Sequence, residues 1–256
     1  MITKKRKAMT LDIIYEPKGA ALEYAPLACN LFKGCIFGCK YCYGPACLRM
    51  SKEEYHSGPN IKTDVIERVT KDAKRLQAAN DKREILLSFI GDVCQTPETV
   101  ELTRQVLEIL GEHDLNAMIL TKGGTKAVPL FPVMQRYKFR FGTSVVWAKD
   151  ELREKWEPNA ATPFDRYDAV WVAQRRYDLK TWVSLEPIIE TYEALVVIRS
   201  MSRIVDYWKV GKINHMPELE KAVDWYQFHK DVIALLDSVG ADYYIKESLQ
   251  RYEVKP

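Results

Sequence analysis

Short apolar runs alternate with amphipathic segments along most of the chain, and this alternation constrains the fold more than any other feature. Near-continuous apolar strands separated by helices predict a parallel sheet covered by helices. The expected strands are 27–31, 85–90, 116–120, 139–146, 182–185, 207–210 and 243–245. The expected helices are 63–80 (with Val65, Val69, Ala73 and Leu76 on one face), 97–110 (capped by Thr96), 129–136, 164–176, 191–201 and 219–239.

The length of 256 residues is enough for one large core, and 47% hydrophobic with 29% charged residues is typical of a globular domain. No internal repeat, low-complexity tract or linker divides the chain. We therefore expect a basic lead-in over 1–26 and a single α/β domain over 27–256. No stretch approaches the ~20 apolar residues of a membrane span. The amino terminus lacks an apolar signal core, so we expect a cytoplasmic protein with no membrane partner.

The net charge of +3 permits nucleic-acid binding without requiring it. Basic runs occur at 4–7, 71–75, 136–140 and 175–176. Solvated helix faces explain the internal runs more simply than phosphate binding does. The run at 4–7 differs because it lies on a terminal arm, and such arms commonly track phosphate groups.

Three of the six cysteines form the run Cys35-Ile-Phe-Gly-Cys39-Lys-Tyr-Cys42. Three thiolates on one short loop can hold three irons of a four-iron cluster and leave the fourth iron open. In a helix the same positions would share one face, where free cysteines pack as small hydrophobes. Gly34 and Gly38 disfavour that helix and suit a backbone that wraps closely around a bound group.

The segment 29–43 resembles the cluster loop of radical S-adenosylmethionine (SAM) enzymes, and within them the spore photoproduct lyase-like branch. Leu31 stands where that pattern has proline. The matching residues are Asn30, Gly34, Cys35, Cys39, Tyr41, Cys42 and Tyr43. The resemblance implies a partial (β/α)6 TIM-like barrel and a [4Fe-4S] cluster on Cys35, Cys39 and Cys42, with SAM on the open iron.

The same resemblance implies an activity. The reduced cluster would cleave SAM to a 5′-deoxyadenosyl radical, which abstracts hydrogen from a substrate that the sequence does not identify. A nucleic acid or nucleotide is one candidate, and an external electron donor of the flavodoxin or ferredoxin type is implied. The sequence leaves the oligomeric state open.

In such barrels the chemistry lies at the carboxyl ends of the strands. Residues 88–98 resemble the branch's T-D-P-Y-Q-P-x-E, with Asp92, Gln95 and Glu98 matching and the prolines and tyrosine absent or displaced. This strand end contacts the SAM amino group in radical SAM enzymes. The resemblance therefore implies that Ser88, Gly91 and Asp92 bind the cofactor.

Three further strand ends carry candidate SAM contacts. Lys122 follows Thr121 as in the family's T-K-S and could reach the SAM carboxylate as a point charge. Thr143 or Ser144 would supply a hydroxyl, and the choice depends on strand register. Glu186 is expected at the barrel mouth. Residues 157–166 match the family's E-P-x-A-x-x-P-x-x-R and are expected to position the following helix.

The carboxy-terminal third departs from the lyases. Its segments 184–188 (SLEPI), 206–211 (DYWKVG) and 243–247 (YYIKE) resemble phage-associated radical SAM proteins instead. Phe89 stands three residues before Asp92, where the lyases place their hydrogen-donating cysteine. Cys94 is the nearest substitute, and we expect it to act as a catalytic hydrogen donor. The resemblance does not extend to thymine-dimer repair.

A non-catalytic metal module is the alternative. Cys35, Cys39 and Cys42 could combine with Cys29, Cys47 or His56 in a structural zinc site or a closed cluster. Zinc modules usually pair two C-x2-C hooks, and only Cys39 and Cys42 form one here. About four irons per chain would favour the enzyme, and about one zinc would favour the module.

Overall fold

The computed structural model describes residues 13–254 and confirms the expected parallel sheet. The strands of the main sheet follow the order β1-β2-β5-β6-β7-β8-β9-β10. Every neighbouring pair from β2 to β10 is parallel, and β1 pairs antiparallel with β2. The strands are β1 (Ile14–Tyr15), β2 (Leu27–Cys29), β5 (Ile85–Leu87), β6 (Ala117–Thr121), β7 (Arg140–Ser144), β8 (Thr181–Ile188), β9 (Tyr207–Lys212) and β10 (Asp242–Ile245).

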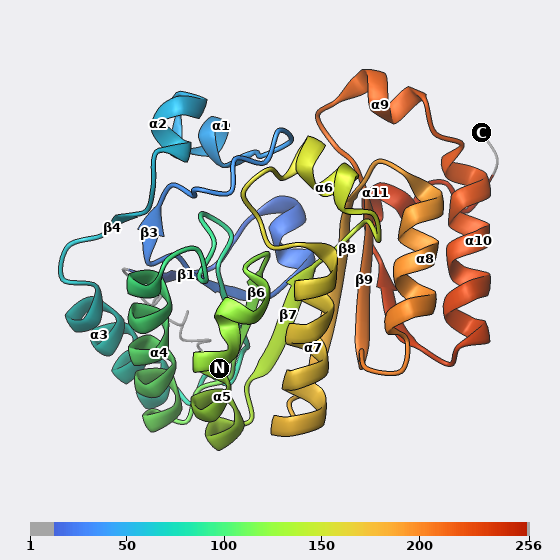
Figure 1. Cartoon of the computed structure of the whole chain (residues 1–256). Helices are drawn as coiled ribbons and strands as arrows, with labels where there is room; N and C mark the ends of the chain where they lie inside the picture. Colours follow the sequence, from blue (N-terminus) through green and yellow to red (C-terminus); the bar gives the residue numbers. More distant parts are fainter. Residues whose placement is uncertain (1–12, 255–256) are drawn as a thin grey trace, which may run out of the picture.

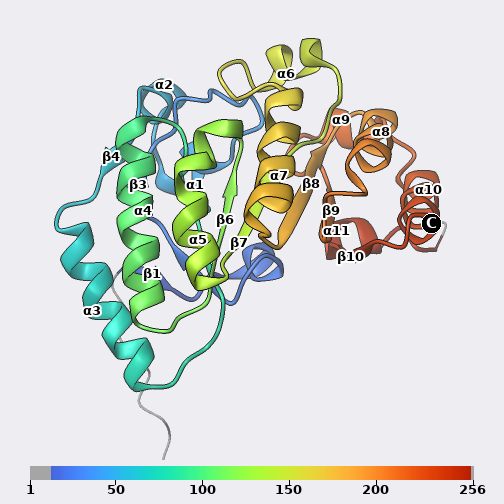
Figure 2. The ribbon, with the colours of Figure 1, turned by 60° about the horizontal axis from the view of Figure 1, so that its bottom comes forward.

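Helices cover one face of this sheet, as Figures 1 and 2 show for α3, α4, α5 and α7. The helices are α3 (Val65–Ala78), α4 (Pro97–Glu112), η2 (Gly124–Leu130), α5 (Phe131–Tyr137), α7 (Pro163–Tyr177), α8 (Thr191–Met201) and α10 (Trp225–Ser238). The predicted apolar face of α3 is buried. Thr96 caps α4 as predicted, because its hydroxyl accepts from the Thr99 backbone N–H at 3.3 Å.

The single helix predicted over 219–239 is wrong. The chain forms α9 (Pro217–Lys221) and then restarts as α10. Asp224 begins the second helix, since its carboxylate accepts from the Gln227 backbone N–H at 2.9 Å. The Trp225 indole N–H donates to the Glu220 carbonyl at 2.7 Å, which turns the chain back on itself. A capping residue inside the periodic run therefore splits it.

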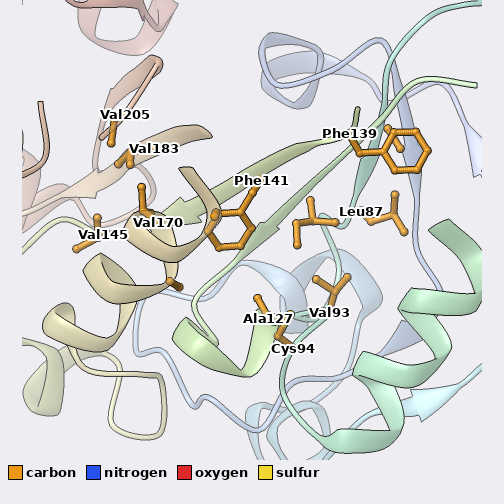
Figure 3. Packing of buried hydrophobic residues seen from close by; sticks show 14 of the residues in the cluster. Leu87, Val93, Cys94, Ala127, Phe139, Phe141, Val145, Val170, Val183 and Val205 are labelled. Atoms are coloured by element: carbon orange, nitrogen blue, oxygen red, sulfur yellow. The ribbon is translucent and has the colours of Figure 1, made fainter. Parts of the chain in front are cut away.

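Alternate residues of each strand face two different clusters. Phe141 and Val183 face the helices, where the Phe141 ring lies 4.9 Å from that of Phe131 (Figure 3). Leu86, Met118 and Trp182 form the other cluster together with Ala25 and Tyr24. We call this second side of the sheet the inner face.

The lead-in before β2 covers part of the inner face. It contains β1 and the 3-10 helix η1 (Gly19–Glu23). Lys209 on β9 donates to the carbonyls of Glu23 and Tyr24, both at 2.7 Å. The Glu23 carboxylate accepts from the Glu247 backbone N–H at 2.7 Å, just beyond β10. Residues 13–26 thus connect the first strands of the sheet to the last two. The basic run at 4–7 lies outside the described residues.

The short elements lie mainly beyond the carboxyl ends of the strands, where Figure 1 shows α1, α2, α6 and α9 along the top edge. They are β3 (Phe32–Lys33), β4 (Asn60–Ile61), α1 (Gly44–Leu48), α2 (Lys52–His56), α6 (Asp150–Trp156) and α11 (Glu247–Gln250). Over residues 13–254, no helix has both the length and the apolar character needed to span a membrane.

Candidate active site

The three motif cysteines lie on one non-helical loop between β3 and α1. Cys35, Cys39 and Cys42 are all free thiols and pack in one small cluster. Gly34 and Gly38 take φ values of +86° and +66°, which disfavour residues with a side chain. The helical alternative considered for this segment is therefore wrong, and the predicted wrapping loop is present.

The thiols lie close enough to influence one another. Burial, the Asp92 carboxylate and the Cys42 thiol together raise the pKa of Cys35 to about 12. Burial also raises the pKa values of Cys39 and Cys42, whereas the Lys122 ammonium lowers them. That ammonium lies 5.8 Å from the Tyr41 ring centroid. These three thiols resist ionisation when no cation is near. Because a bound positive charge favours the thiolate form, their arrangement fits a metal cluster.

Gln95 fixes this loop to the segment that follows β5. Its side-chain oxygen accepts from the Ile36 backbone N–H at 2.9 Å, and its amide donates to the Gly34 carbonyl at 3.2 Å. Gly91 allows the close approach, because a Cβ there would lie 2.7 Å from the Gly34 carbonyl oxygen. Gln95 was among the residues that match the family motif, but the sequence did not predict that it would bond to the cysteine loop.

Asn30 makes a second connection of this kind. Its side-chain oxygen accepts from the backbone N–H groups of Phe89 and Ile90 at 3.0 and 3.1 Å. Its amide donates to the Tyr15 hydroxyl at 2.7 Å. The Tyr43 hydroxyl donates to the Phe89 carbonyl at 2.8 Å, so the loop and the end of β5 are joined on this side too.

Asp92 joins the ends of β5 and β6. Its carboxylate accepts from the Cys94 N–H at 2.9 Å, the Thr121 hydroxyl at 2.5 Å and the Lys122 N–H at 2.7 Å. Burial raises the pKa of this carboxyl, and the same hydrogen bonds oppose the rise. The nearby Ser88 hydroxyl donates to the Gly91 carbonyl at 2.8 Å. The three predicted SAM contacts of this strand end therefore lie together, and their cofactor role stays a prediction.

The register distinguishes Thr143 from Ser144. The Thr143 hydroxyl donates to the Thr121 carbonyl at 2.8 Å, so it is used within the sheet. A Cβ at Gly142 would collide with the Trp182 indole on the inner face. Alternation along the strand then places Ser144 on that same inner face. Of the two residues, Ser144 is therefore the one whose hydroxyl lies on the inner face.

Glu186 lies on the inner side of the sheet near the end of β8. Its carboxylate accepts from the Lys246 ammonium at 2.6 Å, from the Tyr24 hydroxyl, and from the Asn214 amide at 3.3 Å. The Tyr24 hydroxyl also lies 3.0 Å from that of Ser184. Glu186 thus lies at the rim where it was expected. Most of the hydrogen bonds of its carboxylate are made with neighbouring side chains of the protein.

Cys94 is fully buried in the main hydrophobic cluster, where Figure 3 shows it beside Val93 and Ala127. Burial raises its thiol pKa well above the ordinary value. Cys29 is also buried and Cys47 is exposed. A role for Cys94 as hydrogen donor stays a prediction.

The basic run at 136–140 is engaged in ion pairs at both of its ends. Arg136 lies 2.6 Å from Glu108, and Arg140 pairs with Glu84. Across the described part of the chain, no three His, Cys, Asp or Glu side chains are placed to hold a single metal ion. This includes the three motif cysteines, although they share one loop and one packed cluster.

Solved structures with a similar fold were found, whereas no protein-family model and no curated protein matches the sequence. A spore photoproduct lyase variant with bound AdoMet and dinucleoside spore photoproduct superposes with a TM-score of 0.70 at 13% identity. That match covers 94% of this chain and 80% of the lyase chain. The Streptococcus suis protein SuiB bound to S-adenosylmethionine gives 0.64 at 8% identity, over 85% of this chain and 49% of SuiB. The chain therefore has the partial-barrel fold of these radical SAM proteins, as the cysteine loop predicted.

Proposed function

We propose that this chain is a radical SAM enzyme in which Cys35, Cys39 and Cys42 hold a [4Fe-4S] cluster. One observation carries the proposal: three free, mutually interacting thiols lie on one loop beyond the carboxyl ends of the parallel strands. When bound and reduced, the cluster supplies the electron that cleaves SAM to methionine and a 5′-deoxyadenosyl radical. A reducing, cytoplasmic location and a donor of the flavodoxin or ferredoxin type belong to the same proposal.

The residues around the loop suit SAM. The Lys122 ammonium, which acts electrostatically on the Cys39 and Cys42 thiols, offers a point charge to the SAM carboxylate. Ser88, Gly91 and Asp92 present polar groups for the SAM amino group. Because Asp92 already accepts three hydrogen bonds, we expect it to orient this strand end as much as to bind the ligand.

The remaining strand ends offer further polar contacts. Ser144 supplies a hydroxyl on the inner face, and Thr143 supports it from within the sheet. The Glu186 group lies farther along the rim and would meet either the cofactor or the substrate. Since lyase neighbours bind dinucleoside spore photoproduct, a nucleic acid or nucleotide is the substrate class to test first.

The test is anaerobic reconstitution with iron and sulfide, followed by reduction with dithionite in the presence of SAM. We expect about four irons per chain and formation of 5′-deoxyadenosine, measured with DNA, RNA or no nucleic acid present. Cys39→Ala should lose iron and cleavage. Cys47→Ala is the matched control, because Cys47 is an exposed thiol outside the motif. Full iron content in Cys39→Ala, or one zinc in place of iron, would refute the proposal.

A further inference from the structure

One ion pair beneath the cysteine loop is completely buried. The Glu157 carboxylate accepts from the Arg166 guanidinium, and both side chains are 0% exposed. Arg166 also donates to the Ser144 carbonyl at 2.8 Å and to the Ala161 carbonyl at 2.9 Å. Charges this deep need full pairing and hydrogen bonding, and the guanidinium obtains both here.

The second oxygen of Glu157 reaches the cysteine loop. It accepts from the Tyr41 hydroxyl, and Tyr41 stands between Cys39 and Cys42. The loop rests on this segment at a second point, where the Lys40 backbone N–H donates to the Trp156 carbonyl at 2.9 Å. The buried carboxylate thus holds Tyr41, one of the two residues between Cys39 and Cys42.

The same segment contacts two strand ends. Arg166 reaches the carbonyl of Ser144 at the end of β7. The Ala161 backbone N–H donates to the Lys122 carbonyl at 3.0 Å, just beyond the end of β6. A continuous path of hydrogen bonds therefore runs from Tyr41 through Glu157 and Arg166 to the strand ends with candidate cofactor contacts. Positioning α7 alone would not need the bond to Tyr41.

We infer that Glu157 and Arg166 are positioning residues that hold the cysteine loop, through the Tyr41 hydroxyl, in a fixed relation to the ends of β6 and β7. This inference rests on the proposed function, because it is the cluster and SAM whose relative placement the path would set. Because the Tyr41 hydroxyl donates to Glu157, its removal would affect SAM binding through the position of the loop.

The chain contains a matched control. On the outer surface the Tyr137 hydroxyl donates to Glu108 at 3.1 Å, and Arg136 pairs with the same carboxylate at 2.6 Å. This group has the same three residue types as the buried one, but the Arg136 side chain is 63% exposed. Tyr137→Phe thus removes an equivalent hydroxyl far from the cysteine loop.

The experiment compares Tyr41→Phe with Tyr137→Phe and the unchanged chain after reconstitution. Iron content is measured first, and SAM is then titrated while the electron paramagnetic resonance spectrum of the reduced protein is followed. Because Tyr41→Phe leaves the buried ion pair intact, the protein should fold and retain its iron. We expect the SAM concentration at half-response to rise about tenfold in Tyr41→Phe and to stay unchanged in Tyr137→Phe.

A Tyr41→Phe protein that keeps its iron and responds to SAM like the unchanged chain would overturn the inference while leaving the proposed function intact. Loss of iron in that variant would also overturn it, since the hydroxyl would then retain the cluster rather than place it. If the unchanged chain holds no iron or gives no response to SAM, the proposed function itself fails, and the inference fails with it.

Discussion

Replacing Glu157 by Gln should destabilise the protein more than almost any other isosteric change in the chain. The substitution keeps the side-chain shape but leaves the Arg166 guanidinium without its counter-charge. Both side chains are 0% exposed, so water cannot solvate the remaining charge. The amide group of Gln also brings a donor to a position where the carboxylate accepts from both Tyr41 and Arg166.

The magnitude follows from this burial. Removing one partner of a buried ion pair costs about 3–5 kcal/mol, a large part of the roughly 5–15 kcal/mol that stabilises a typical domain. The matched change Glu108→Gln breaks a pair whose arginine is 63% exposed, and should cost less than about 1 kcal/mol. With a urea dependence of about 3 kcal/mol per molar, the two unfolding midpoints should differ by roughly 1 M.

Urea unfolding of the metal-free proteins at pH 7, followed by circular dichroism, measures the difference. Replacing both Glu157 and Arg166 by Leu should lose less stability than Glu157→Gln, since no unpaired charge stays behind. Equal midpoints for Glu157→Gln and Glu108→Gln would refute the reasoning, because they would show that the Arg166 charge is solvated.

Three other changes test separate parts of the structure. Lys122→Ala should weaken SAM binding by about one to two orders of magnitude in calorimetry with iron content unchanged, because a charge-assisted contact contributes roughly 1.5–3 kcal/mol; unchanged affinity would mean that SAM binds elsewhere. Gly34→Ala should destabilise the metal-free protein by about 2 kcal/mol or more in urea unfolding, since its φ is +86° and its Cβ would collide with the Gly58 carbonyl. Burial lowers the pKa of Lys209 from 10.5 to about 8, so the folded state binds fewer protons than the unfolded state between those values. Relative to Lys209→Met, the unchanged chain should therefore gain stability as the pH rises from 8 to 10.5. If the free energies of unfolding of the two proteins changed equally with pH, this would be contradicted.

Sequence periodicity was sufficient to predict the parallel sheet, because its strands are apolar on both sides and its longer helices carry one apolar face. The cap at Thr96 was readable because capping depends on neighbouring residues only. The break between α9 and α10 was missed for the opposite reason. Asp224 and Trp225 interrupt a run whose apolar spacing continues across them, and periodicity does not register a local hydrogen bond.

The cysteine loop was likewise readable from spacing, whereas its supports were not. The bond from Tyr41 to Glu157 joins residues 116 positions apart, and that from Gln95 to Ile36 spans 59. Which hydroxyl of Thr143 and Ser144 faces inward required the pairing of β7 with its neighbours. Which partners these side chains choose depends on the tertiary structure. The residue types alone show only that the side chains can form hydrogen bonds.

The lead-in that crosses the inner face has a consequence for the order of folding. Glu23 is separated from Glu247 by 224 residues, and Tyr24 from Lys209 by 185. Contacts this distant in sequence close very large loops and form late. During synthesis, residues 13–26 must wait until β9 and the chain after β10 have been made, and Tyr24 stays unpaired with Trp182 and Glu186 for most of that time. A chaperone that binds exposed aromatic segments would find a long-lived target here, in a segment that is made early and buried late.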